Sequence, residues 1–338
     1  MVANYDVYLI DRIIGQGGYA IESMVVSYLD RNYVGGGLNE LLVHEAVHLI
    51  DRQFAPNRLA FLSEGLAVWV SGGHYKQEDL NQRMAALVEM GRYDPLSNLI
   101  EDFYSVQHEI GYLEAAGLIT YLVDLYGWPQ VRAFYADTTA DDGITLTKAV
   151  DANMKLYFDK SLEEIEAGWM DYLETLPRNR EAAGDLRATI RLYDAVRQYQ
   201  KIYDSSAYFG DAWLPSPHDM EKLGATADFT RHPESTVNIT LETMLNAASV
   251  ALQRGNLSQA NALTSSVIRV LANDGLILDP LAGAYRNLVL ASIVLGYEVQ
   301  QISLSGNQAV VSVTGMEGKT LSLIQLTLQE DREWAVTR

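Results

Sequence analysis

Residues 39–70 of the chain read NELLVHEAVHLIDRQFAPNRLAFLSEGLAVWV. Apolar residues recur every three or four positions on both sides of Pro56, which predicts helices over residues 39–51 and 58–70. A proline ends one helix, and a second helix can start directly after it, so we expect the two to fold back on each other as an antiparallel hairpin. This predicted hairpin fixes which residues of the two helices lie opposite each other.

The first helix of the hairpin carries the pentapeptide His44-Glu45-Ala46-Val47-His48, which is an HExxH pattern. The two imidazoles lie on one face of a helix, about 6 Å apart along its axis, and can converge on one Zn²⁺ ion. Glu45 is then placed to act as the general base that takes a proton from a water on the metal. HExxH alone is a weak signal, because such a short pattern also arises by chance, so a third ligand is needed.

Pro56 provides a geometric reason to choose that ligand. His48 lies eight residues before Pro56 and Glu64 lies eight residues after it, and positions equidistant from a hairpin turn lie level with each other. Two histidines and one glutamate leave the fourth tetrahedral position for water, which is the pattern of catalytic zinc sites. The sequence therefore predicts one zinc ion bound by His44, His48 and Glu64. The alternative, a helical hairpin with satisfied polar side chains or without its metal, stays open.

The two motifs together carry a family resemblance. His44-Glu45-x-x-His48 followed by Ser63-Glu64-Gly65-Leu66-Ala67 resembles the gluzincin metallopeptidases, in particular the peptidase MA-like group. Residues 111–117, which read GYLEAAG, resemble the helix on which related aminopeptidases carry the tyrosine that stabilises the tetrahedral intermediate. The resemblance covers about residues 20–176 and does not extend further.

The resemblance implies zinc-dependent hydrolysis of peptide bonds, with a peptide or protein as substrate. It implies two catalytic residues, Glu45 as the general base and Tyr112 as the donor to the developing oxyanion. Tyr112 has an alternative role, because it also falls on the helical stripe that contains Ala115 and Ile119 and that is typical of a core-facing surface.

The chain departs from its relatives at several positions. The aspartate that follows the glutamate ligand by four residues in thermolysin is Val68 here, so the hydrogen-bond partner of the histidine ligands is unassigned and Asp51 is a candidate. The Gly-Ala-Met-Glu-Asn motif that binds a substrate amino terminus is absent, which favours endopeptidase action. Residues 24–29 are a candidate edge strand for an extended peptide. His74 could line the cleft, but a loop histidine is usually solvated, and His108 could face the site, but helix capping or exposure is the favoured interpretation.

The whole chain is predicted to be α+β: a mostly helical gluzincin-like domain with a small N-terminal sheet, then a helical hairpin and an antiparallel meander. The domains are predicted at residues 1–178 for the metallopeptidase domain, 179–238 for a helix and an irregular connection, and 239–338 for a C-terminal α+β module. Helices are predicted over residues 39–51, 58–70, 77–90, 108–126, 129–135, 162–176, 181–203, 241–254 and 258–272.

The last third of the chain alternates apolar and polar residues. This alternation predicts strands over residues 299–304, 309–314 and 320–328, with a bulge between Leu323 and Ile324 where the alternation changes phase. Helices followed by a curved meander are compatible with an NTF2-like cone, an interpretation that depends on fold analogy alone.

Composition limits the class of protein and its partners. The 338 residues are 48% hydrophobic and 20% charged, which is typical of a folded globular chain. The net charge of −19 opposes binding to nucleic acid, and the absence of cysteine excludes disulfides and thiolate ligands. No membrane span and no signal peptide are predicted; the resemblance implies an extracytoplasmic location. The oligomeric state stays open, and the alternative function is a non-catalytic binding or scaffolding protein that retains a peptidase-like fold.

Overall fold

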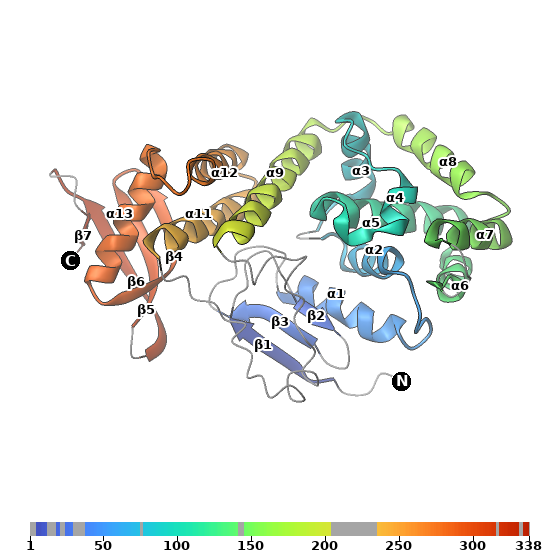
Figure 1. Cartoon of the computed structure of the whole chain (residues 1–338), viewed down its shortest axis with the longest axis horizontal. Coiled ribbons are helices and arrows are strands. Elements are labelled where there is room, and N and C mark those ends of the chain that lie inside the picture. Colours follow the sequence, from blue (N-terminus) through green and yellow to red (C-terminus); the bar gives the residue numbers. More distant parts are fainter. Residues whose placement is uncertain are drawn as a thin grey trace. The chain divides into compact units, whose positions relative to one another are not determined.

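The computed structural model describes residues 5–11, 18–20, 24–29, 38–74, 77–140, 145–203, 235–315, 318–330 and 334–337. Within these residues the chain is α+β, as predicted: it is mainly helical, with one small sheet near the start of the sequence and one near its end (Figure 1). Its contacts divide it into two compact units, of which Gly35–Ile190 and Arg191–Arg338 are the main parts. This division crosses a helix, α9, whereas the predicted boundary at residue 178 precedes that helix.

The first unit is built mainly from helices that follow one another with short connections. They are α1 (Leu38–Asp51), α2 (Ala60–Ser71), α3 (Leu80–Glu89), α4 (Leu96–Glu101), the 3-10 turn η1 (Phe103–Ser105), α5 (His108–Tyr126), α6 (Trp128–Asp137), α7 (Leu146–Phe158), α8 (Leu162–Thr175) and the first part of α9 (Arg180–Tyr203). The helices predicted in this region agree with the structure to within three residues at each end. The prediction omitted α4 and α7, although Thr145, which caps α7 by accepting a hydrogen bond from the Lys148 N–H, was an available signal.

α1 packs on α2, and α2 packs on α5, which is the central helix of this unit (Figure 1). Apolar side chains of α2 and α5 form the middle of the core; Leu62, Val68, Leu118 and Leu122 have no exposed surface. A side chain at Gly65 would meet the backbone oxygen of Ala115 at 2.6 Å. The glycine therefore permits the close crossing that sets the distance between the helix that carries Glu64 and the helix that carries Tyr112.

A three-stranded sheet precedes α1. Its strands β1 (Val7–Asp11), β2 (Gly18–Ala20) and β3 (Met24–Leu29) are arranged in the order β1-β3-β2, and β2 packs against α1. The prediction that residues 24–29 are an edge strand is therefore wrong: β3 is the middle strand, and its backbone groups pair on both sides. Residues 12–17, between β1 and β2, lie outside the described residues.

The described residues of the second unit include the end of α9, further helices and a meander. These elements are α11 (Thr236–Gln253), α12 (Leu257–Leu271), α13 (Pro280–Val294), β4 (Tyr297–Ser305), β5 (Gln308–Gly315), β6 (Gly318–Leu328) and β7 (Trp334–Val336). The strands pair antiparallel in chain order, and α13 packs on β4 and β5. The predicted bulge between Leu323 and Ile324 is wrong, because these residues pair in register with Ser312 and Val311; the register shifts instead between Val299 and Gln301. Residues 204–234, which make up most of the predicted irregular connection, lie outside the described part of the chain.

None of the helices that the structure describes combines the length and the hydrophobicity needed to cross a membrane. The NTF2-like arrangement of the second unit stays a prediction.

Candidate metal centre

The structure brings His44, His48 and Glu64 together at the interface between α1 and α2. Glu64 Oε2 lies 3.3 Å from His44 Nε2 and 3.4 Å from His48 Nε2. The candidate ligand atoms of the three side chains all lie within 4.8 Å of one another, and the two imidazole rings stand edge to face with their centroids 5.0 Å apart. Three neutral or anionic donors that converge in this way can hold a metal ion.

Electrostatic attraction between Glu64 and the two histidines changes the pKa values of Glu64 and His48. Burial raises the pKa of Glu64, but the contacts with His48 and His44 outweigh it and hold the pKa of this carboxyl well below its usual value. Burial lowers the pKa of His48, whereas the attraction of Glu64 raises it, and the net pKa is raised. The carboxylate is therefore ionised beside two imidazoles, and a cation can replace the protons that this arrangement attracts.

Glu45 lies next to this group and differs from Glu64 in its environment. The residue is 3% exposed, and its Oε2 atom has no hydrogen-bond partner among the residues that the structure describes. Burial is the largest cause that raises the pKa of Glu45, to about 7. A buried carboxyl oxygen without a partner is costly unless another molecule contacts it. The donor set and this oxygen together fit a metal ion that carries a water molecule.

A buried hydrogen-bond network supports His48 from the side opposite Glu64. His48 Nδ1 lies 3.0 Å from the Ser63 hydroxyl, which donates to Asp51 Oδ2 at 3.1 Å. Arg58 Nε lies 3.0 Å from Ser63 Oγ and 2.7 Å from Asp51 Oδ2, and the Arg58 guanidinium also donates to the His48 carbonyl oxygen at 3.1 Å. Tyr135 from α6 donates to the same Asp51 oxygen at 2.5 Å. Asp51, the candidate partner named from the sequence, thus reaches His48 through Ser63.

Tyr112, His74 and His108 form an aromatic cluster beside His44. The Tyr112 ring stacks on the His74 ring with a centroid distance of 4.1 Å, and the His108 ring lies 4.7 Å from Tyr112 and 5.0 Å from His74. The ring centroid of His44 is 6.3 Å from that of His74 and 6.5 Å from that of Tyr112. The expectation that His74 is solvated is wrong, because its side chain is 10% exposed and its ring stacks on Tyr112. His108, at the start of α5, is half-buried, with its ring against Tyr112.

Glu109, on the first turn of α5, contacts His74: Glu109 Oε2 lies 3.3 Å from His74 Nδ1. Arg83 of α3 donates to the other Glu109 oxygen at 2.7 Å and also contacts Glu78 at 2.8 Å and Asp185 at 2.5 Å. Burial lowers the pKa of His74 more than Glu109 raises it, so the imidazole is neutral more readily than an exposed one. The cluster is thus held by a buried ionic network that ties together α3, α5 and α9.

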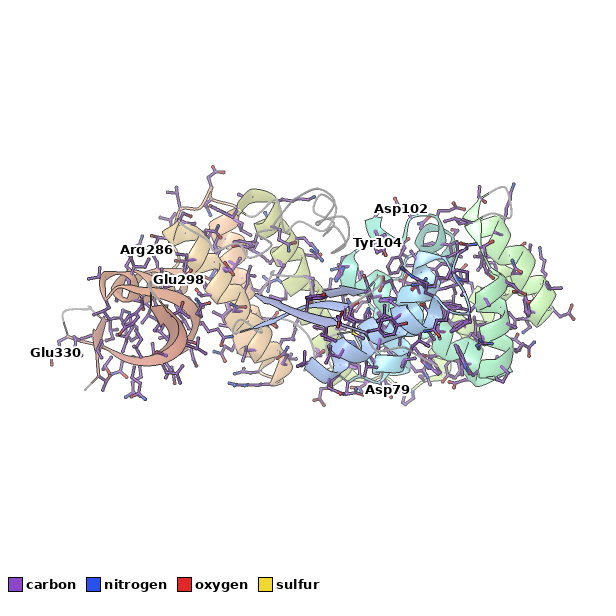
Figure 2. The ribbon with its side chains drawn as sticks, turned by 90° about the horizontal axis from the view of Figure 1, so that it is seen from below. Asp79, Asp102, Tyr104, Arg286, Glu298 and Glu330 are labelled. Carbon is purple, nitrogen blue, oxygen red and sulfur yellow. The ribbon has the colours of Figure 1, made fainter. Side chains whose placement is uncertain are left out.

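Tyr104 of η1 contacts the candidate metal ligand Glu64 from the solvent side. Its hydroxyl donates to Glu64 Oε1 at 3.2 Å, although 41% of the residue is exposed. Figure 2 labels Tyr104 together with Asp102, which directly precedes η1. Glu64 therefore uses one oxygen toward the histidines and the other toward Tyr104, which limits its rotation.

The sequence interpretation did not identify Ser63, Arg58, Tyr135 or Tyr104 as parts of the site. Ser63 had a local signal, because it directly precedes Glu64 on the helix that faces the histidines. The other three lack such a signal: Tyr135 follows Asp51 by 84 residues and Tyr104 follows Glu64 by 40.

Comparison of the chain with protein-family models, with curated proteins and with solved structures finds no match in any of the three.

Proposed function

We propose that the protein is a zinc-dependent peptidase of gluzincin type that cleaves peptide bonds within an extended chain. The observation that carries the proposal is the convergence of His44, His48 and Glu64, with the unpartnered oxygen of Glu45 beside them. Two imidazoles and one carboxylate match the ligand set of catalytic zinc sites, which keep one position for water.

When bound, a zinc ion polarises the scissile carbonyl and lowers the pKa of a water molecule toward ~7. Glu45 accepts the proton of that water at its carboxyl oxygen and later delivers it to the leaving amine. Its pKa of about 7, which burial causes, suits a group that must both take and give a proton near neutral pH.

Tyr112 is the proposed donor to the oxyanion that develops on the substrate carbonyl. Support comes from its place beside His44, within the aromatic cluster that Glu109 and Arg83 hold in position. The core-facing role considered from the sequence also has support, because Tyr112 is buried against Phe103 and His74. Mutation separates the two roles, as described below.

Metal analysis combined with a cleavage assay tests the proposed function. We expect one zinc ion per chain after reconstitution, and cleavage of an unfolded protein substrate that a chelator abolishes and added zinc restores. A preparation that stays free of metal after reconstitution would instead favour the non-catalytic binding or scaffolding role.

The variant Glu45→Gln separates metal binding from chemistry. It removes the base but no ligand, so we expect full zinc content and a loss of at least about 100-fold in kcat. Glu40→Gln, which changes a glutamate in the first turn of the same helix, is the matched control and should keep both properties. Unchanged hydrolysis by Glu45→Gln would contradict the assignment of the base.

A further inference from the structure

We infer that Ser63 is a positioning residue that fixes the tautomer of His48 and so prepares its Nε2 atom for a metal ion. The inference deepens the proposed function and depends on it for the identity of the ion. In the protein without metal, three side chains surround the Ser63 hydroxyl.

The Ser63 hydroxyl has one proton to donate and two lone pairs to accept with. Its contacts are Asp51 Oδ2 at 3.1 Å, Arg58 Nε at 3.0 Å and His48 Nδ1 at 3.0 Å. A carboxylate oxygen only accepts, so the single hydroxyl proton goes to Asp51. A guanidinium N–H only donates, so Arg58 occupies one of the lone pairs.

One lone pair of Ser63 Oγ then remains for His48 Nδ1, which must therefore be the donor and carry the ring proton. In a neutral imidazole with a proton on Nδ1, Nε2 is the atom with the free lone pair. This Nε2 atom points to Glu64 Oε2 at 3.4 Å, which is the side where the candidate ligands converge. The hydroxyl thereby selects the one tautomer that can ligate a metal at this position.

The rest of the network keeps the hydroxyl in this role. Tyr135 donates to the Asp51 oxygen that receives the Ser63 proton, and Arg58 forms an ion pair with the same oxygen. Both Asp51 and Tyr135 are almost completely buried. Rotation of the hydroxyl proton toward His48 would place the Ser63 and Asp51 oxygens against each other without a proton between them. Arg58 in addition holds the His48 carbonyl oxygen, which restricts the backbone of the same residue.

Ser63 also directly precedes Glu64, so α2 supplies both a metal ligand and the group that orients a ligand of the facing helix. Displacement of α2 relative to α1 would therefore change both contacts together. The structure assigns to Ser63 the task that a carboxylate or a carbonyl oxygen performs directly at many metal sites.

Nitrogen NMR of the metal-free protein tests the tautomer directly. Two-bond nitrogen–proton correlation spectra at alkaline pH, where the imidazole is neutral, distinguish a proton on Nδ1 from a proton on Nε2. We expect His48, assigned by comparison with His48→Gln, in the Nδ1–H form, and we expect Ser63→Ala to populate the Nε2–H form. A wild-type His48 in the Nε2–H form would overturn the inference, whether or not the protein binds zinc or cleaves peptides.

Zinc affinity provides the second measurement, by competition with a chromophoric chelator. We expect Ser63→Ala to weaken zinc binding by about 10- to 100-fold and Ser63→Thr, which keeps the hydroxyl, to restore most of the affinity. The control is Ser71→Ala, since Ser71 is also buried on α2 but its hydroxyl contacts the backbone oxygens of Val68 and Gly73. Equal affinities of Ser63→Ala and Ser71→Ala, with both proteins folded by circular dichroism, would overturn the inference.

Discussion

The Tyr112 side chain is buried and yet lies beside His44, one of the candidate metal ligands. Its ring stacks on His74 and lies near His44, so its hydroxyl can act on a substrate only if the carbonyl approaches from that side. A catalytic role and a packing role predict different effects of removing the hydroxyl while the ring stays.

We expect Tyr112→Phe to lower kcat by about 10- to 100-fold with little change in zinc content, because a donor to the transition state is lost. Tyr126→Phe is the matched control on the same helix, since Tyr126 packs on Phe158 away from the cluster. Steady-state kinetics of the two variants, with metal analysis of each, check the prediction. If both variants retain the wild-type kcat, Tyr112 has a packing role only.

Glu114, two residues further along α5, is a buried carboxyl outside the metal-binding group. Its Oε1 atom accepts the Asp94 N–H at 2.8 Å, and its Oε2 atom has no partner in the described part of the chain. Burial raises the pKa of Glu114 from 4.5 to about 9, with smaller contributions from the nearby carboxylates of Asp94 and Glu166. The folded protein therefore holds a proton that the unfolded chain releases near pH 4.5.

This difference makes stability depend on pH with a definite sign. The folded pKa is raised, so the stabilisation is complete below the unfolded pKa of 4.5 and is lost as the pH rises toward about 9. Between these two pH values, the single Glu114 proton lowers the free energy of unfolding of the wild type by about 1.4 kcal/mol for each unit that the pH rises. We expect this contribution to be absent in Glu114→Gln. Urea denaturation across this range measures the slope; Glu163→Gln, on the exposed face of α8, should leave it unchanged.

At the scale of elements, the crossing of α2 and α5 determines where the site residues stand. Glu64 and Tyr112 lie on the two helices on either side of the contact between Gly65 and the Ala115 backbone. No flexible side chain separates the helices there, so a methyl group can be accommodated only if a helix moves.

We expect Gly65→Ala to destabilise the protein by about 1–3 kcal/mol, because the clash outweighs the gain of up to about 1 kcal/mol in helix propensity. Gly283→Ala in α13 is the control, since a side chain there meets nothing within 4 Å and should stabilise the protein slightly. Thermal denaturation compares the two variants. A gain in stability for Gly65→Ala would show that the crossing is not limiting.

At the scale of the whole molecule, the candidate metal ligands belong to one of two compact units. All three candidate ligands lie on α1 and α2, within Gly35–Ile190, whereas α11, α12 and α13 belong to Arg191–Arg338. A ligand that binds only the folded state stabilises the part that holds it, by about 2.7 kcal/mol at 100 times Kd.

We therefore expect zinc to slow amide hydrogen exchange in α1 and α2 and to leave exchange in α11 to α13 unchanged. Mass spectrometry of peptic fragments, with and without a chelator, measures both regions in one experiment. The variant His48→Gln should abolish the difference. Slower exchange limited to α11 to α13 would contradict the assignment of the metal-binding group.

Much of the first unit follows from the sequence, because its signals are local. The HExxH spacing puts two imidazoles on one turn, and Pro56 divides two amphipathic segments, so the proximity of Glu64 could be argued from positions in the chain alone. Residues 24–29 form a strand, as their composition indicates. Their position at the edge of the sheet was predicted wrongly, because composition carries no information about neighbouring strands, and β3 is the middle strand.

The sequence by itself thus determined the helical hairpin and the three candidate metal ligands, because these depend on spacing within one or two helical turns and one reversal. Only the tertiary structure decided which groups surround them. Tyr135 reaches Asp51 from α6, Tyr104 reaches Glu64 from η1, and Arg83 joins Glu109 to Asp185. Such contacts join residues far apart in the chain, and they form because buried polar groups must find partners wherever the packing of apolar helices brings them.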